Sequence, residues 1–276
     1  MEASLKSYYF IFCKDDLLLQ RQPDDTHTIP CTAEPPIEIK PWTHILNVAT
    51  MEDGTQVKAF KVDSPLSLVM TDDQLCDDGY DFISLRQSFY HLSLQLYLMA
   101  GKCRELLYWD QNTKFCGVCG APMKMSTDIS KRCSECGKEV WPQLAIAIIV
   151  LIHRGDEALL VHARNFKGDF YGLVAGFVET GETLEEAVHR EVSEETGLSI
   201  DNIRYFGSQP WPYPSGLMVG FNADYVSGDV HLQKSELSKG SWFRYDNLPR
   251  IPQRLSIARK LIDNWLSGYG IILEQE

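Results

Sequence analysis

The sequence lacks any apolar run that could cross a membrane. The longest such run, Leu144–Ile152, is far shorter than the roughly 20 residues that a membrane-spanning helix needs. The first segment also lacks a basic leader and a small-residue cleavage site, so we expect no signal peptide. These absences predict a cytoplasmic protein.

The sequence also lacks an excess of positive charge. It has 26 Lys and Arg residues but 38 Asp and Glu residues, and the formal net charge is −12. This balance argues against a protein that holds nucleic acid by bulk electrostatics, because such binding needs a basic surface. A polyanionic substrate would therefore need local cations: bound metal ions, Arg or Lys.

Internal repeats and low-complexity tracts are missing as well. Hydrophobic residues make up 44% of the 276 residues and charged residues 23%, which is typical of a globular protein with a core. The pattern predicts an N-terminal domain at residues 1–108, a small insert at 109–140 and a second domain at 141–276.

The N-terminal domain carries no chemical motif, so we interpret it as a structural or dimerising α/β domain. A segment at Leu68–Leu75 leads to a helical stretch, Asp81–Ala100, in which Leu, Tyr and Phe recur at helical spacing. The predicted strands are Tyr8–Cys13, Thr43–Thr50 and Val57–Val62.

The second domain alternates strands with two helices. A hairpin turns at Arg154–Asp156, and the two helices are Thr183–Thr196 and Arg254–Trp265, the second with one apolar stripe. The predicted strands are Leu144–Ile152, Glu157–Ala163, Tyr171–Gly176, Ile203–Ser208, Leu217–Val226 and Ser241–Tyr245.

The insert contains two CxxC pairs. Four thiolates at this spacing suit tetrahedral zinc in a closed, structural site. Unliganded cysteines, a redox pair and an iron–sulfur cluster are the alternatives. The insert also carries Lys and Arg, so a local nucleic-acid-binding face competes with a plain folding role. The proposed zinc ligands are Cys116, Cys119, Cys133 and Cys136, whereas Cys13, Cys31, Cys76 and Cys103 are interpreted as free thiols.

The helix at Thr183–Thr196 concentrates negative charge. Thr183 and Glu186 predict a capping box, and Gly197 suits the helix end. Glu191 and Glu195 lie four residues apart, where like charges repel. Such a cluster is either a solvated acidic face or a set of oxygen ligands for a divalent cation.

The whole segment resembles the Nudix box and fills each of its fixed positions: Gly176, Glu182, Arg190, Glu191, Glu194, Glu195 and Gly197. The resemblance implies that Glu191, Glu194 and Glu195 hold Mg²⁺ or Mn²⁺ and that Arg190 orients a box glutamate. It implies that Glu182 supports the loop and that Gly176 and Gly181 allow tight turns beside the phosphates. Glu236 and the backbone of Ala175 are assigned to the same site.

A proline-rich aromatic segment follows the helix: Gln209, Pro210, Trp211, Pro212, Tyr213, Pro214 and Ser215. Three prolines interleaved with Trp and Tyr form a stiff wall, on which a base or nicotinamide could stack. A rigid loop that packs into the core is the alternative.

The segment resembles the signature of NudC-type NADH pyrophosphatases, a branch of the Nudix family that also has a zinc ribbon before its Nudix domain. Tyr213 stands where Phe is usual, and Gly216 where the signature has Ser. The resemblance implies that the whole segment binds substrate, together with Trp141, Phe177, Ala258 and, in the first domain, Arg86.

This resemblance implies an α-β-α sandwich with a mixed sheet, preceded by the ribbon and the N-terminal domain. It implies metal-dependent cleavage of NAD(H) to NMN(H) and AMP, action on NAD-capped RNA, and a homodimer in which Trp141 reaches across the interface. Two alternatives stay open. One is a Nudix pyrophosphatase for ADP-ribose or dinucleoside polyphosphates, and the other is a non-catalytic zinc-ribbon protein that binds nucleic acid.

Overall fold

The computed structural model describes residues 6–63 and 79–272. The chain divides into two compact units, residues 1–143 with 212–215 and residues 144–211 with 216–276. The expected segment Leu68–Leu75 lies outside the described residues, and the three-domain division stays a prediction. Within the two described ranges, no helix has both the length and the apolar character that crossing a membrane requires.

The first unit is built on a seven-stranded sheet in the order β3-β2-β1-β6-β5, with β4 on β1 and β7 on β2. Strand β1 runs parallel to β6 and antiparallel to β2. Six of the seven β1 residues are buried, which is typical of a strand covered on both faces. The strands are β1 (Ser7–Cys13), β2 (Asp16–Arg21), β3 (His27–Thr28), β4 (Cys31–Thr32), β5 (Leu46–Thr50), β6 (Gln56–Val62) and β7 (Tyr80–Ser84).

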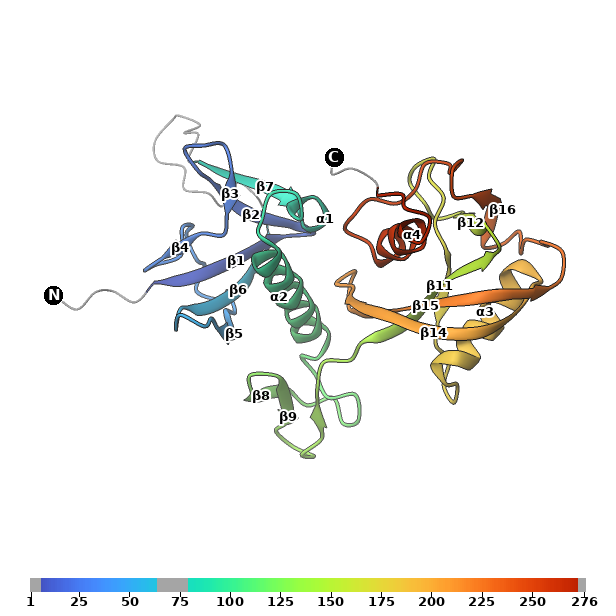
Figure 1. Cartoon of the computed structure of the whole chain (residues 1–276). Coiled ribbons are helices and arrows are strands. Elements are labelled where there is room, and N and C mark those ends of the chain that lie inside the picture. Colours follow the sequence, from blue (N-terminus) through green and yellow to red (C-terminus); the bar gives the residue numbers. More distant parts are fainter. Residues whose placement is uncertain (1–5, 64–78, 273–276) are drawn as a thin grey trace. The chain divides into compact units, whose positions relative to one another are not determined.

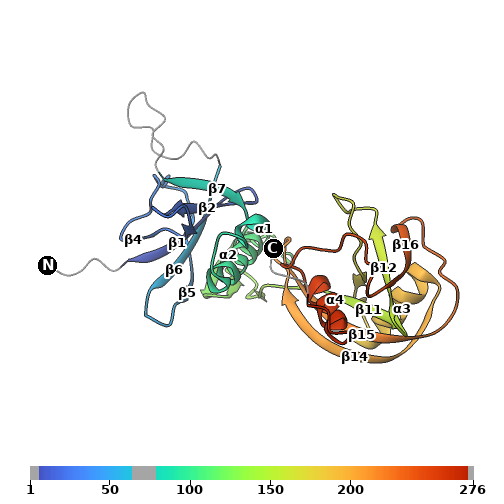
Figure 2. The same cartoon turned by 45° about the horizontal axis from the view of Figure 1, so that its top comes forward.

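The helix predicted at Asp81–Ala100 is wrong in its first half. Residues Tyr80–Ser84 form β7, and the chain then makes a short α1 (Leu85–Ser88) before the long α2 (Leu94–Asn112). Strand pairing overrides the helical spacing here: β7 pairs antiparallel with β2 along its whole length, and the Asp81 carboxylate also accepts a hydrogen bond from the Arg21 guanidinium at 2.8 Å. Helix α2 packs along the sheet, as Figures 1 and 2 show.

The insert at residues 109–140, the expected zinc ribbon, forms a small antiparallel sheet in the order β10-β9-β8. Its strands are β8 (Met123–Thr127), β9 (Ser130–Cys133) and β10 (Glu139–Val140). Most of its side chains are exposed, so the segment has too little core to fold by burial alone.

The second unit has a six-stranded mixed sheet, β14-β15-β11-β12-β16, with β13 on β11. The predicted hairpin is confirmed, since Arg154 pairs with Glu157, and β11 lies parallel to β15. The strands are β11 (Ala145–Arg154), β12 (Glu157–Ala163), β13 (Val174–Phe177), β14 (Ser199–Pro210), β15 (Gly216–Ser227) and β16 (Leu237–Arg244).

Strand β11 separates two hydrophobic cores. Its even-numbered residues Ile148, Val150 and Ile152 pack with side chains of α3 (Leu184–Thr196). Its odd-numbered Ile149 and Leu151 pack with α4 (Ile257–Ser267). Alternate side chains of a strand point to opposite faces, so the sheet lies between the two helices (Figures 1 and 2).

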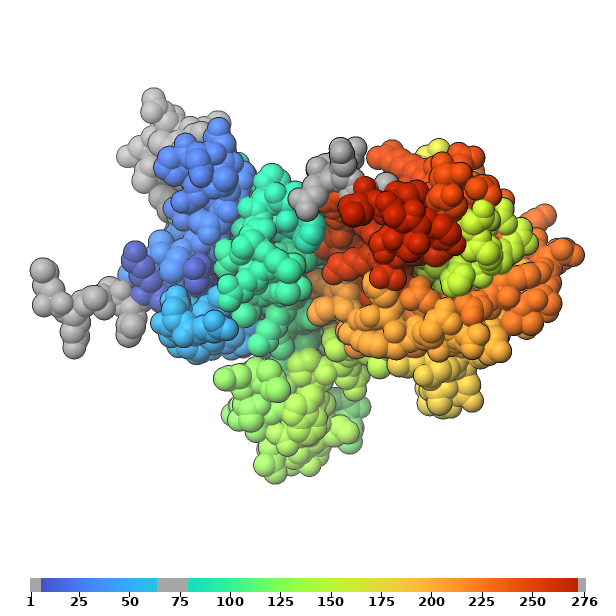
Figure 3. Space-filling model, in the orientation of Figure 1, coloured from blue at the N-terminus to red at the C-terminus, as the bar shows by residue number. Residues whose placement is uncertain are grey.

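The expected sandwich is therefore confirmed. The apolar stripe predicted for the last helix is also confirmed, because Ala258, Leu261, Ile262 and Trp265 are all buried. In the space-filling view, the dark red atoms of α4 lie on the surface of the second unit (Figure 3).

Candidate active site and zinc centre

The four cysteines of the ribbon converge on one point. Their sulfur atoms all lie within 4.8 Å of one another, with Cys116 Sγ 3.6 Å from Cys136 Sγ and Cys119 Sγ 3.4 Å from Cys133 Sγ. All four thiols are free, as are Cys13, Cys31 and Cys103, whereas Cys76 lies outside the described residues. Four gathered thiols suit a closed tetrahedral zinc site.

Backbone groups favour the thiolate form of two of these cysteines. The amide N–H groups of Cys136 and Glu135 lower the pKa of Cys133 to about 6, and those of Cys119 and Val118 lower the pKa of Cys116. A backbone hydrogen bond from Lys138 also lowers the pKa of Cys136, but the thiols of Cys133, Cys116 and Cys119 together raise it to about 12. A thiolate is the form that binds a metal. Gly120 and Gly137 take φ values of 76° and 72° after the two pairs, as tight knuckle turns require.

The acidic helix α3 begins and ends as predicted. Thr183 Oγ1 accepts the Glu186 N–H while Glu186 Oε2 accepts the Thr183 N–H, which completes the capping box. Gly197 closes the helix with φ 71°. These caps fix the helix ends and therefore fix which residues share the face turned toward β13.

Arg190 holds three carboxylates together. Its guanidinium donates to Glu182 at 2.5 and 3.0 Å, to Glu191 at 2.9 Å and to Glu194 at 3.2 Å, and it also reaches the Phe177 carbonyl at 2.9 Å. This bonding keeps the pKa of Glu182 below its ordinary value. One fixed cation thus offsets much of the repulsion along the helix.

Gly176 has a role that differs from the predicted one. Its φ lies outside the left-handed region, so no tight turn demands glycine there. A Cβ at this position would instead lie 1.9 Å from the Glu191 carboxyl carbon. Because Gly176 has no side chain, the Glu191 carboxylate can occupy the space beside it. Gly181, with φ 95°, does need the conformational freedom of glycine.

Glu195 is the most unusual carboxyl group of the cluster. Its residue is only 7% exposed, and its Oε2 is buried without a hydrogen-bond partner. Burial, with the charges of Glu191, Glu236 and Glu194, raises its pKa to about 7. A buried, unsatisfied carboxylate amid other carboxylates fits the chemistry of a divalent cation site.

The glutamates are arranged more openly than the cysteines. Among residues 6–63 and 79–272, the four cysteines alone bring three or more ligand atoms within 4.8 Å of one another. Glu236 lies in the segment before β16, where its N–H donates to the Gln233 carbonyl at 3.0 Å. An open arrangement leaves positions for water and phosphate oxygens.

The other predicted residues of the second unit fall into two kinds. Phe177 is 65% exposed at the end of β13, as a stacking ring requires. Ala175 pairs with Ile149 in the sheet, and Ala258 is buried in the α4 core, so neither side chain faces solvent freely. Gln209 is buried, and its amide bonds the Leu255 carbonyl and the Ile257 N–H at 2.6 Å each.

Residues 212–215 of the aromatic segment belong to the first unit and pack within it. The Tyr213 hydroxyl lies 3.2 Å from the Tyr97 hydroxyl on α2, and the Arg86 guanidinium lies 4.7 Å from the centre of the Tyr213 ring. Gly101 gives the Pro212 ring room, since a Cβ there would lie 3.2 Å from it. Sequence reasoning missed Tyr97 and Gly101, because no local pattern links residues so far apart.

The contacts and exposure of three further residues near this segment can be stated directly. Ser215 Oγ donates to the Gln143 carbonyl at 3.0 Å, and Trp141 is 53% exposed. Gly216 lies in a tight place, because a Cβ there would lie 3.1 Å from the Ala145 carbonyl of the paired strand. That close approach gives a physical reason for glycine in place of serine.

Comparisons with known proteins cover nearly the whole chain. Residues 142–265 match the model of the NUDIX domain, and residues 111–140 match the NADH pyrophosphatase zinc ribbon domain. Residues 6–109 match the NADH pyrophosphatase-like rudimentary NUDIX domain. The first hundred residues, in which sequence analysis found no chemical motif, therefore also match a domain of this family.

Named relatives match over long stretches. The NAD-capped RNA hydrolase NudC of Pseudomonas aeruginosa is 39% identical over 215 residues, 78% of this chain and 74% of that protein. The proteins of the same name from Klebsiella pneumoniae and Haemophilus influenzae are 44% and 45% identical, over 68% and 67% of this chain and 73% and 72% of their own lengths. The ribbon cysteines form a structural zinc site, and the acidic helix belongs to a hydrolase domain that uses divalent metal. This chain belongs to the NudC-type NADH pyrophosphatase branch of the Nudix hydrolase family.

Proposed function

We propose that this chain hydrolyses the pyrophosphate bond of NAD(H), giving NMN(H) and AMP, and also removes NAD caps from the 5′ ends of RNA. The observation that carries the proposal is the acidic cluster on α3, in which Arg190 clasps three glutamates beside the buried Glu195. The names of the matched relatives and domains supply the substrate class.

The residues of this chain would hold the cation and prepare the site. Glu191, Glu194 and Glu195 would be its ligands, with Glu236 and the Ala175 carbonyl beside them. A bound divalent ion supplies charge neutralisation at the phosphates and lowers the pKa of a water nucleophile. Arg190 keeps Glu191 and Glu194 in place, and Gly176 leaves the Glu191 carboxylate its space.

The aromatic residues would bind the two flat ends of the dinucleotide. Phe177 and Trp141 are exposed, so each ring has a free surface for stacking. Residues 209–215 form a stiff wall, because Pro212 and Tyr213 are fixed against α2. We assign Arg86 and Ala258 to substrate binding, and Gln209, at the end of β14, to bonding the start of α4.

Product analysis tests the proposal. The purified chain is incubated with NADH and Mg²⁺, and in parallel with Mn²⁺, and we expect equal amounts of AMP and NMNH. Glu195→Gln should abolish product, while Glu185→Gln, an exposed change on the same helix, should not. Cleavage of ADP-ribose or diadenosine polyphosphates with NADH left intact would overturn the substrate assignment.

Capped RNA forms a second arm of this test. We expect NAD-capped RNA to yield 5′-monophosphate RNA and NMN. If the wild type cleaves no nucleotide while Glu195→Gln keeps affinity for RNA, the chain is a nucleic-acid-binding protein on an inactive Nudix scaffold.

Three finer points stay predictions. We expect a homodimer to which Trp141 contributes across the interface, and sedimentation equilibrium measures its mass. We expect a cytoplasmic location, which fractionation of the cells that make the protein checks. Parallel rates with Mg²⁺ and Mn²⁺ decide which ion the glutamates prefer.

A further inference from the structure

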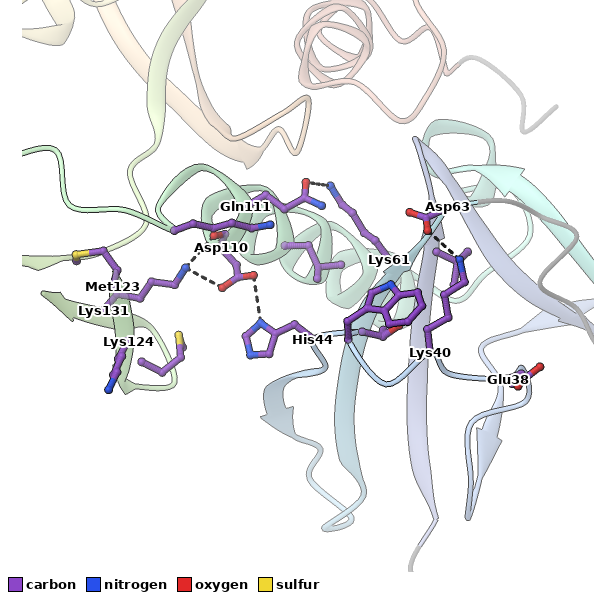
Figure 4. Close-up of a pocket in the computed structure, with 16 residues that line it drawn as sticks. Glu38, Lys40, His44, Lys61, Asp63, Asp110, Gln111, Met123, Lys124 and Lys131 are labelled. Carbon is purple, nitrogen blue, oxygen red and sulfur yellow. Dashed lines mark hydrogen bonds and ion pairs between the residues drawn. The ribbon is translucent and has the colours of Figure 1, made fainter. Parts of the chain in front are cut away.

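A cavity in the first unit shares no residue with the sites assigned above. It has a volume of about 540 Å³, within the range of pockets for small ligands. Its walls come from the segment before β5, the end of β6, the end of α2 and the zinc ribbon (Figure 4). Its charged lining consists of Lys40, Lys61, Lys114, Lys124, Lys131, Glu38, Asp63 and Asp110.

The lining is positive in a chain whose net charge is −12. Five lysines face three carboxylates there, an excess of two positive charges. A concave surface with one dominant sign of charge concentrates ions of the opposite sign. The cavity therefore favours an anion.

Two of the lysines are already neutralised. Lys131 is buried and pairs with Asp110 at 2.8 Å, and Asp110 also contacts His44 at 3.3 Å (Figure 4). Lys40 pairs with Asp63 at 3.1 Å near the surface. These pairs serve the fold and leave the other three lysines as candidates for a ligand.

The remaining three lysines form no ion pair with the residues that the structure describes. The side chains of Lys114 and Lys124 have no hydrogen bond or ion pair with residues 6–63 or 79–272. Lys61 donates to the neutral Gln111 amide, at 2.6 Å. Burial and then the charge of Arg104 lower the pKa of Lys61 by more than the charges of Asp15 and Asp110 raise it. A bound anion would offset this cost.

Trp42 gives the cavity an exposed aromatic ring, which the binding of a simple anion does not need. This lining residue is 75% exposed, and the Lys40 ammonium lies over its ring, 5.7 Å from the ring centre. An exposed indole offers a flat face on which a base stacks. Glu38, also in the lining, can accept a hydrogen bond from an amino group of such a base.

We propose that this cavity binds a nucleoside phosphate, with its phosphates on Lys61, Lys114 and Lys124 and its base on Trp42. The site lies in the first unit and is separate from the acidic cluster on α3. It is independent of the proposed hydrolysis, so either assignment can fail without the other.

The lining favours a mononucleotide over a polynucleotide. A polynucleotide track needs a continuous basic surface, but Glu38 and Asp63 interrupt the lysines and the chain as a whole is acidic. Three available lysines match the two or three phosphate groups of a nucleotide.

Fluorine NMR of the full chain tests the proposal. The protein is labelled with 5-fluorotryptophan, Trp42 is assigned through Trp42→Phe, and ADP is added without divalent metal. We expect the Trp42 resonance to shift and saturate with ADP, and to stay in place with adenosine. This local signal separates the cavity from any nucleotide bound at the acidic cluster.

Two lysine variants locate the site. Lys124→Glu and Lys61→Gln should each weaken the ADP response about tenfold or more, because each removes a charge-assisted contact. Lys102→Gln, an exposed change on α2 outside the lining, should leave it unchanged. Circular dichroism and zinc content verify folding, and Lys124 is exposed, so Lys124→Glu decides the matter if Lys61→Gln misfolds.

Four results would overturn the proposal. They are no Trp42 shift at millimolar ADP, an equal response to inorganic phosphate, an unchanged response in Lys124→Glu, and tighter binding of a short single-stranded oligonucleotide than of ADP. The last result would make the cavity part of a nucleic-acid track.

Discussion

The zinc ribbon and the acidic helix both offer ligands to a metal ion, but they prepare those ligands in opposite ways. The four cysteine sulfurs lie within 4.8 Å of one another, and backbone N–H groups lower the pKa of Cys133 while the neighbouring thiols raise that of Cys136. The glutamates are spread along α3 and clasped from one side by Arg190, while burial raises the pKa of Glu195.

This difference separates a structural site from a catalytic one. A structural ion replaces a missing core, so its ligands close around it and leave no free position. A catalytic ion must also hold water and phosphate, so its ligands stay apart and its site costs folding energy. Four changes test this contrast, beginning with the largest expected effect.

Replacing a zinc ligand should damage the fold of the ribbon. We expect Cys133→Ser to lose zinc and to expose residues 116–136 to protease, because this segment has little core and a structural zinc contributes on the order of 10 kcal/mol in small domains. Elemental analysis and limited proteolysis measure both effects. Cys31→Ser, a free thiol outside the ribbon, is the control. A variant that kept one zinc per chain would show that three thiolates suffice.

Filling the space beside Glu191 should damage catalysis and spare the fold. Gly176→Ala places a Cβ where the Glu191 carboxylate lies, so the carboxylate must move. Because small displacements in an active site cost about a hundredfold in rate, we expect kcat to fall by about that factor. Gly207→Ala, in β14 with nothing within 4 Å of its Cβ, controls for glycine replacement in the same sheet. Unchanged kcat in Gly176→Ala would mean that Glu191 needs no fixed position.

Replacing Arg190 with lysine tests the clasp itself. Lysine keeps the charge but cannot bond Glu182, Glu191 and Glu194 at once, since its ammonium is a point charge without the planar fork. We expect kcat to fall about 10- to 100-fold, the usual cost of losing a residue that orients metal ligands. Arg259→Lys, which alters an Arg–Asp pair on α4, should have little effect. Equal activity in both variants would reduce Arg190 to a source of charge.

Much of the acidic site follows from local sequence. The capping box, the glycine at the helix end and the alternating core residues of β11 are all set by neighbours along the chain, so their patterns predict them. The ribbon cysteines are equally readable, because their spacing itself fits one ion.

The rest depends on contacts between distant residues. Helical spacing at Asp81–Ala100 did not reveal that Tyr80–Ser84 pairs with β2, since strand pairing is decided by residues some sixty positions away. The tyrosine pair between Tyr97 and Tyr213 and the space that Gly176 gives Glu191 leave no local trace either. Sequence therefore predicts the chemical groups of the site better than it predicts what positions them.

The smallest expected effect is on the free energy of unfolding of the metal-free protein, which the acidic cluster should lower. The pKa of Glu195 is raised to about 7 from 4.5, so the folded state favours its neutral form. Between these two pH values the folded chain holds a proton that the unfolded chain has lost. The stability of the metal-free protein should therefore fall as pH rises from about 4.5 to 7, and stay reduced above that.

Glu195→Gln should remove this loss. At pH 8 without divalent metal, we expect the variant to be more stable than the wild type by about 1 to 3 kcal/mol, while at pH 4.5 the two should match. Urea unfolding at both pH values, without a chelator so that zinc stays bound, measures the difference. Glu185→Gln, exposed on the same helix, should show no such dependence. A wild type as stable at pH 8 as the Glu195→Gln variant would mean that Arg190 already neutralises the cluster. The metal-free acidic helix would then carry no cost in folding free energy, and the contrast with the ribbon would fail on this point.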